Sequence, residues 1–141
     1  MSYSYLDHGA DIGLEAKHET LEGVFAEAAR GLFSLMVDIN GIGTQETVEL
    51  NLKGSSLEDL LYEWLSELIS LSNLKGHAYS EFPNLTIKKD DSKFHLKAHA
   101  SGTRIDPRRH DLGTEVKAIT YQGLEIEERD EGWRCRYVVD V

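Results

Sequence analysis

The sequence predicts an α+β fold, a two-layer sandwich in which two helices pack on one face of a mostly antiparallel six- or seven-stranded sheet. Two segments, 20–38 and 56–75, repeat apolar residues every three or four positions, which is the period of a helix with one buried face. Most other segments alternate apolar and polar residues, as strands with one buried face do. The chain has 141 residues, no repeat and only two prolines, so residues 1–141 are expected to form a single domain.

Two short strands and a helix are expected in the first part of the chain. Residues 3–7 and 12–16 alternate apolar and polar side chains, and Gly9 and Gly13 bracket the turn between them. Thr20 is the expected N-cap of the first helix, because its hydroxyl can accept hydrogen bonds from free N–H groups of the first turn. The apolar positions of this helix are Leu21, Val24, Phe25, Ala28, Leu32, Leu35 and Met36.

A loop, a strand and the second helix follow. Residues 40–44 contain two glycines, and residues 48–52 alternate as a strand with one solvated face. Ser56, with Asp59 three residues later, resembles a capping box, and Gly76 is the expected C-terminal stop. The apolar stripe of this helix consists of Leu57, Leu60, Leu61, Trp64, Leu65, Leu68 and Leu71.

The remainder is expected to form strands joined by turns. In order, these are a strand at 85–87, a turn at 90–92, a strand at 94–100, a loop at 101–113, strands within 116–126, a turn at 130–132 and a strand at 133–139. Cys135 lies in the last of these and is expected to be a buried structural thiol. As the single cysteine, it excludes an internal disulfide.

The composition excludes several functional classes. A net charge of −10 argues against extensive binding to a nucleic-acid backbone, which requires a basic surface. No apolar run approaches the roughly 18 residues of a membrane-spanning helix, and the first residues do not resemble a signal peptide. Phosphate-binding, nucleophile-elbow and Cys/His zinc motifs are absent from the sequence. A cytoplasmic location is the expectation that remains.

Carboxylates gather at two places where strands start or stop. Asp7, His8 and Asp11 lie in the first turn, and Asp140 adjoins the main-chain carboxylate of Val141. Turn chemistry explains the early aspartates, which can bond local N–H groups. A hard cation bound through oxygen atoms is the alternative, because it would relieve the repulsion between adjacent carboxylates. A terminus lying in water, where screening makes that repulsion small, remains open as well.

Basic residues concentrate in one stretch of this acidic chain. They suit either a solvated loop with weak surface ion pairs or a local site for phosphate or carboxylate groups. Lys117, beside Glu115 in an expected strand, is positioned better than the loop arginines. Tyr121 is equally consistent with hydrogen bonding or stacking and with core packing. The basic residues are Arg104, Arg108, Arg109, His110 and Lys117.

Five segments together resemble the archease family. They are LDHGADIGLEA near the start, TLEGVFAEAARGLFSLMVD in the first helix, LLYEWLSELI in the second, RHDLGTEVKAITYQGLEI later on, and the final VVDV. The resemblance covers essentially the whole chain in the same order, and EVKAITY is distinctive. It implies a two-layer α/β sandwich made of a single archease-like domain.

The resemblance also implies a function. Archease is a small cytosolic protein without an established reaction of its own that activates the GTP-dependent tRNA-splicing RNA ligase, promoting guanylylation of the ligase and multiple turnover. The resemblance also implies a divalent cation bound at Asp11, Asp140 and Val141, with calcium as the first choice and manganese or magnesium as alternatives. The resemblance ties Lys117 to activation of the ligase, and His110 is expected near the cation. Contact with RNA is expected to be at most indirect, and no membrane partner is expected.

Two departures from the family pattern stand out. Gly9 replaces a threonine of the early loop, and Gln122 replaces a frequent histidine. Glu115, in the same EVK motif as Lys117, is assigned with Lys117 and His110 to activation of the partner.

Two other functions remain as alternatives. One is a metal-dependent phosphoesterase with His8 or His110 as its base, and the other is a chaperone-like module that binds unfolded clients through exposed apolar surface.

Overall fold

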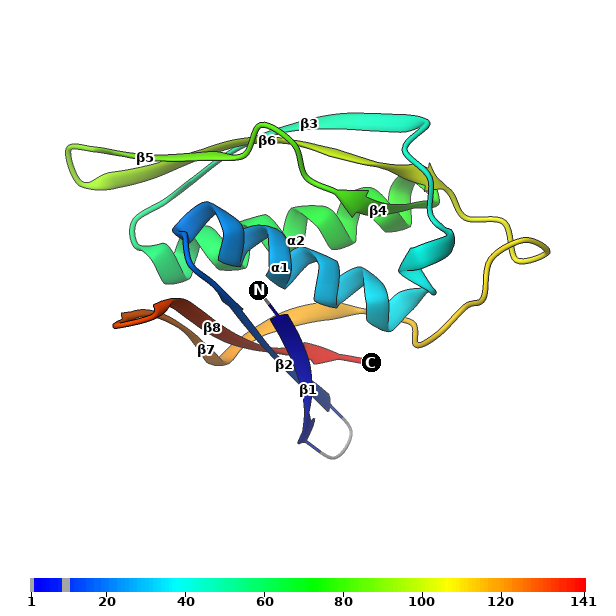
Figure 1. Ribbon diagram of the computed structural model, residues 1–141, viewed down its shortest axis with the longest axis horizontal. Helices are drawn as coiled ribbons and strands as arrows, with labels where there is room; N and C mark the ends of the chain where they lie inside the picture. Colours follow the sequence, from blue (N-terminus) through cyan, green and yellow to red (C-terminus); the bar gives the residue numbers. More distant parts are fainter. Residues whose placement is uncertain (1, 9–10) are drawn as a thin grey trace.

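The computed structural model describes residues 2–8 and 11–141 and has three layers, with two helices lying between two antiparallel sheets (Figure 1). The strand order is β1-β2-β8-β7 in the first sheet and β3-β6-β4 in the second, where β5 also pairs with β6. The elements are β1 (Ser2–His8), β2 (Asp11–His18), α1 (Leu21–Met36), a 3-10 turn (Ile39–Gly41), β3 (Glu46–Gly54), α2 (Leu57–Lys75), β4 (His77–Glu81), β5 (Thr86–Asp90), β6 (Lys93–Arg104), β7 (Ala118–Arg129) and β8 (Gly132–Asp140).

The α+β class, the two helices and the antiparallel pairing are confirmed, but the prediction of one sheet is wrong. Eight strands form two sheets, so the helices are covered on both sides. Alternation shows that one face of a strand is buried, but it does not show which strands share a sheet. The sequence reading also missed β4, because four consecutive residues, 77–80, are buried and no alternation appears.

The helix boundaries follow the predicted caps. The Thr20 hydroxyl accepts a hydrogen bond from the Gly23 N–H at 3.0 Å, and the Ser56 hydroxyl accepts one from the Asp59 N–H at 3.1 Å. Gly76 ends α2 with φ of 69°, the left-handed conformation that glycine adopts without strain. The caps, which are local in sequence, are therefore the part of the fold that sequence patterns predict best.

Both helices bury their apolar stripes in one continuous core. The Trp64 indole N–H of α2 donates to the Phe25 carbonyl of α1 at 3.0 Å, and the Tyr137 hydroxyl of β8 donates to the Ala28 carbonyl at 2.7 Å. Cys135 is fully buried, and burial raises the pKa of its thiol to about 12, which agrees with a structural role.

The second sheet is built around β6. β3 pairs along one edge of β6, while β5 and then β4 share the other edge. Because β6 extends to Arg104, the predicted loop at 101–113 begins four residues too early. Ser101 and Gly102 are both buried, so the alternation that marks a strand fails there.

None of the helices within residues 2–8 and 11–141 is long and apolar enough to span a membrane.

Candidate functional site

The two strands that carry the expected aspartate ligands, β2 and β8, pair directly with each other. Asp11 of β2 and Asp140 of β8 are register partners in the first sheet, and Ala118 of β7 pairs with Asp140 on its other side. Leu14 and Ala16 face the helices, so the alternate positions, including Asp11 and Asp140, lie on the outer face of the sheet. Directly opposed side chains have Cβ atoms roughly 5 Å apart. The structure therefore brings the two carboxylates together.

The main chain of Lys117 is hydrogen-bonded to Asp140. Its N–H donates to the carbonyl oxygen of Asp140 at 2.8 Å, just before β7 begins at Ala118. The strand thus starts two residues later than the sequence suggested. Val116 is buried and Lys117 is exposed, so the backbone is anchored while the ammonium group is free to meet a ligand or a partner.

Val141 follows β8 and is held by its side chain. The side chain is half-buried and packs against the hydrophobic core. This contact holds Val141 next to Asp140, the residue before it in the sequence. Asp11, Asp140 and Val141 thus lie at one end of the sheet, where β2 begins and β8 ends.

The arrangement depends on the carboxyl group of Val141. Within residues 2–8 and 11–141, no three His, Cys, Asp or Glu side chains form a group that could hold a metal ion. Asp11 and Asp140 are two of the three expected ligands, and the third, Val141, is expected to bind through its main chain. The backbone of His8 pairs with Asp11, but its side chain, like residues Gly9 and Ala10, lies outside what the structure describes.

The segment leading to Lys117 is held by the end of α1. The Gly113 N–H donates to the Met36 carbonyl at 2.8 Å, and the Thr114 N–H donates to the Leu35 carbonyl at 2.9 Å. These bonds satisfy carbonyl groups that a helix leaves free at its C-terminus. They also require close approach of the two backbones, because a Cβ added at Gly113 would overlap the Leu35 carbonyl oxygen.

We therefore expect Gly113→Ala to lower the free energy of unfolding by about 2 kcal/mol, because a backbone contact must shift. Gly41→Ala is the matched control, since a Cβ added there meets nothing within 4 Å. It should change stability by less than about 0.5 kcal/mol. Urea unfolding of both variants measures the difference, and equal stabilities would show that the segment tolerates displacement.

The other basic residues lie apart from this edge. The Arg108 side chain is 91% exposed, and its guanidinium lies 3.6 Å from the Asp106 carboxylate. His110 is bound within the same loop, where its Nδ1 accepts a hydrogen bond from the Asp106 N–H at 2.9 Å. Among the described residues no hydrogen bond or ion pair joins His110 to Lys117. Glu115 is exposed, and among the described residues neither Glu115 nor His110 forms a side-chain hydrogen bond or ion pair with Asp11 or Asp140.

Tyr121 lies against α2 rather than in the core. Its ring stacks on Tyr62 with centroids 4.1 Å apart, and its hydroxyl donates to the Asp59 carboxylate at 2.7 Å. That hydrogen bond, followed by burial, raises the pKa of Tyr121 to about 12. A register shift between Thr120 and Glu125 and the positive φ of Gly123 (79°) turn this part of β7. The stacking and hydrogen-bonding interpretation of Tyr121 is confirmed.

The far end of the same outer face carries an ion-pair network. The buried Arg134 guanidinium lies 2.7 Å from Glu125, 2.9 Å from Glu127 and 3.3 Å from Glu15. Hydrogen bonds from Arg134 and then Arg129 lower the pKa of Glu127. Burial alone would lower the pKa of Arg134, but the bonds to Glu125 and Glu127 raise it overall. The Arg134 guanidinium and the three glutamates thus stabilise one another and link β2, β7 and β8.

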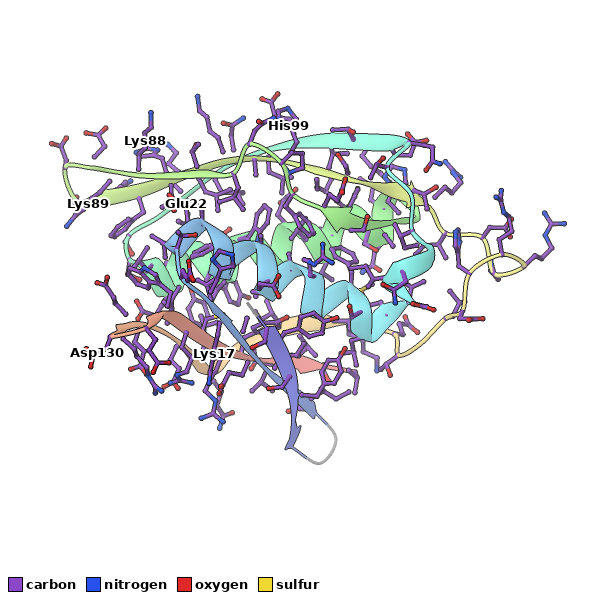
Figure 2. The ribbon with its side chains drawn as sticks, in the orientation of Figure 1. Lys17, Glu22, Lys88, Lys89, His99 and Asp130 are labelled. Atoms are coloured by element: carbon purple, nitrogen blue, oxygen red, sulfur yellow. The ribbon has the colours of Figure 1, made fainter. Side chains whose placement is uncertain are left out.

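A hollow of about 510 Å³ lies beside that network, lined by residues such as Lys17, His18 and Trp133. Lys17 and Asp130 mark this end of the sheet in Figure 2, away from the end where the chain reaches Val141 in Figure 1. The hollow is therefore separate from the paired carboxylates.

Comparison with known proteins identifies the family of the chain. Residues 3–141 match a family model described as "Archease protein family (MTH1598/TM1083)". "Protein archease" of Methanosarcina mazei is 37% identical over 139 residues, which cover 99% of this chain and 95% of the relative. The solution structure of protein 1598 of Methanobacterium thermoautotrophicum superimposes with a TM-score of 0.87 at 30% identity, covering 99% and 98% of the two chains.

A crystal structure from Thermotoga maritima, described as an archease and possible chaperone, has a TM-score of 0.58 at 24% identity and covers 96% of this chain and 94% of that one. At this identity the likeness shows the fold alone. The family model and the full-length relatives carry the assignment, and they match the chain from its first strand to Val141. The chain belongs to the archease family.

Proposed function

We propose that this protein is a non-catalytic, cation-binding activator of the GTP-dependent tRNA-splicing RNA ligase. It promotes guanylylation of the ligase and multiple turnover, and it acts in the cytoplasm. The observation that carries the proposal is the direct pairing of Asp11 with Asp140, next to the backbone of Lys117. Residues from the early and the late part of the chain meet at one end of the first sheet, where a partner can reach them.

The paired carboxylates fit a divalent cation. Two like charges placed directly opposite each other across a sheet repel, and this destabilises the pairing. A cation held by Asp11, Asp140 and the Val141 carboxyl group removes the repulsion. All three groups bind through oxygen, which favours calcium, with manganese or magnesium as alternatives. When bound, such an ion supplies charge neutralisation for phosphate groups nearby.

Lys117 gives this end of the sheet a second function, which is to dock against the ligase. Lys117 is exposed, and its N–H donates to the Asp140 carbonyl oxygen, so its backbone is tied to β8. An exposed lysine can meet a carboxylate or phosphate of the ligase nucleotide site. Asp140 positions this lysine through its carbonyl oxygen and contributes to the cation site through its side chain. Docking and cation binding are therefore coupled through one residue.

The test is guanylylation of the cognate RNA ligase with GTP, followed with and without a catalytic amount of this protein. We expect faster guanylylation and more than one ligation event per ligase molecule when the protein is present. Calcium, manganese and magnesium are compared in parallel. Absence of stimulation by the folded protein with every ion would contradict the proposal. Turnover of generic phosphoesters without ligase would instead favour the hydrolase alternative.

A further inference from the structure

The outer face of the second sheet is basic, although the protein as a whole carries a net charge of −10. Lys53 of β3 and Lys88 of β5 both pair with His95 of β6, and so flank it on either side. Lys93 and Lys97 of β6 occupy the same face, because they alternate with inward residues such as Leu96. Figure 2 shows Lys88 and His99 on the side of this sheet away from the helices.

The closest carboxylate contacts on this face go to histidines. The Glu49 carboxylate lies 3.7 Å from His99, and the Asp90 carboxylate lies 4.0 Å from His95. In the part of the chain that the structure describes, no ion pair involves Lys53, Lys88, Lys93 or Lys97. Four lysines outside any ion pair therefore share the face with three carboxylates, because the register also places Asp90 opposite Lys93 and pairs Glu81 of β4 with Ser101.

The positive charges are spread over an area that suits an extended polyanion. Lys53 and Lys88 stand two strand spacings apart, roughly 10 Å, and Lys93 and Lys97 stand roughly 13 Å apart along β6. All side chains that β3, β5 and β6 present on this face are polar. The face lies beyond the helices from the paired Asp11 and Asp140 (Figure 1), so a ligand here would not block that edge.

We propose that this face, formed by β3, β5 and β6, binds the phosphate backbone of double-helical RNA. Protein interfaces are centred on aromatic, methionine or arginine anchors and are depleted in lysine, which is the reverse of this face. Phosphate backbones are bound by lysine together with short polar side chains such as threonine and asparagine, and both types are present. The choice of RNA over DNA rests on the proposed function. The overall net charge had suggested at most indirect contact with RNA, but it averages over a face of opposite sign.

The experiment measures fluorescence anisotropy of a labelled RNA duplex of about 20 base pairs, from about 50 to 200 mM salt and without ligase. We expect binding that weakens steeply with salt. Lys88→Gln combined with Lys97→Gln should weaken it roughly tenfold and lower the slope of log K against log salt by about 2. Lys17→Gln combined with Lys75→Gln makes the same change in net charge elsewhere and should leave affinity nearly unchanged.

Four outcomes would overturn the proposal. They are no binding by the wild-type protein at the lowest salt, equal losses in the two double variants, displacement of RNA by polyglutamate at a lower concentration of charge, and loss of ligase guanylylation in the Lys88/Lys97 variant without RNA. The last would mean that this face contacts the ligase. RNA binding without any stimulation of guanylylation by the wild-type protein would leave this inference standing and reject the proposed function.

Discussion

Lys117→Ala should abolish activation of the RNA ligase while leaving the protein folded. The side chain is exposed, and the structural contribution of the residue is its N–H, which any residue except proline can provide to Asp140. We expect the free energy of unfolding to change by less than about 0.5 kcal/mol, as for other surface substitutions. Guanylylation should fall more than tenfold, because the ammonium group that is proposed to meet the ligase nucleotide site is removed.

The comparison uses Lys75→Ala, which removes an exposed lysine from the last turn of α2. It should activate the ligase as the wild-type protein does. Lys117→Arg separates charge from shape, since it keeps the positive charge on a planar group. A variant Lys117→Ala that is unfolded by circular dichroism would show a structural role for the residue. A folded variant with full activity would remove Lys117 from the mechanism.

Asp11→Asn should have opposite effects on stability with and without a divalent cation. Without the ion, the substitution removes repulsion from Asp140 and should stabilise the protein by up to about 1 kcal/mol. With the ion, the wild-type protein should gain stability and the variant should gain much less, because one charged ligand is lost. Thermal unfolding with calcium or with a chelator measures both signs, and titration calorimetry should show a cation affinity weaker by roughly tenfold or more.

Two controls make this test specific to the edge. Asp130→Asn removes a carboxylate from the exposed turn at the other end of the same sheet and should leave the response to calcium unchanged. Residues added after Val141 should weaken cation binding, because the carboxyl group is then an amide. Equal responses to calcium in the wild-type protein and Asp11→Asn would reject the site, and unchanged affinity after the extension would reject Val141 as a ligand.

The sequence predicted the local parts of the fold well. Thr20 and Ser56 cap the helices as expected, and Gly76 ends the second one, because each of these signals acts within a few residues. The grouping of strands into two sheets was not predictable, because it depends on which buried faces meet across the core. β4 escaped notice for a related reason, since its residues are buried on both faces.

The candidate site shows the same division. Asp11, Asp140 and Lys117 were proposed from residue type and family resemblance, and the strand register brings their backbones together. Their assigned functions stay predictions. His110 was expected near the cation; its ring accepts a hydrogen bond within its own loop, and its position relative to the cation stays a prediction. The basic outer face was missed because its lysines are spread over three strands and become neighbours only through pairing.

The position of β8 between β2 and β7 has a consequence for how the protein is made. During synthesis, the β1–β2 hairpin, both helices and the whole second sheet leave the ribosome before β8 does. Until β8 inserts, Asp11 has no partner strand, and β7 has nothing to join it to β2. Such distant pairing is slow to form. A nascent chain without β8 would lack the paired carboxylates, so the proposed cation site is completed last.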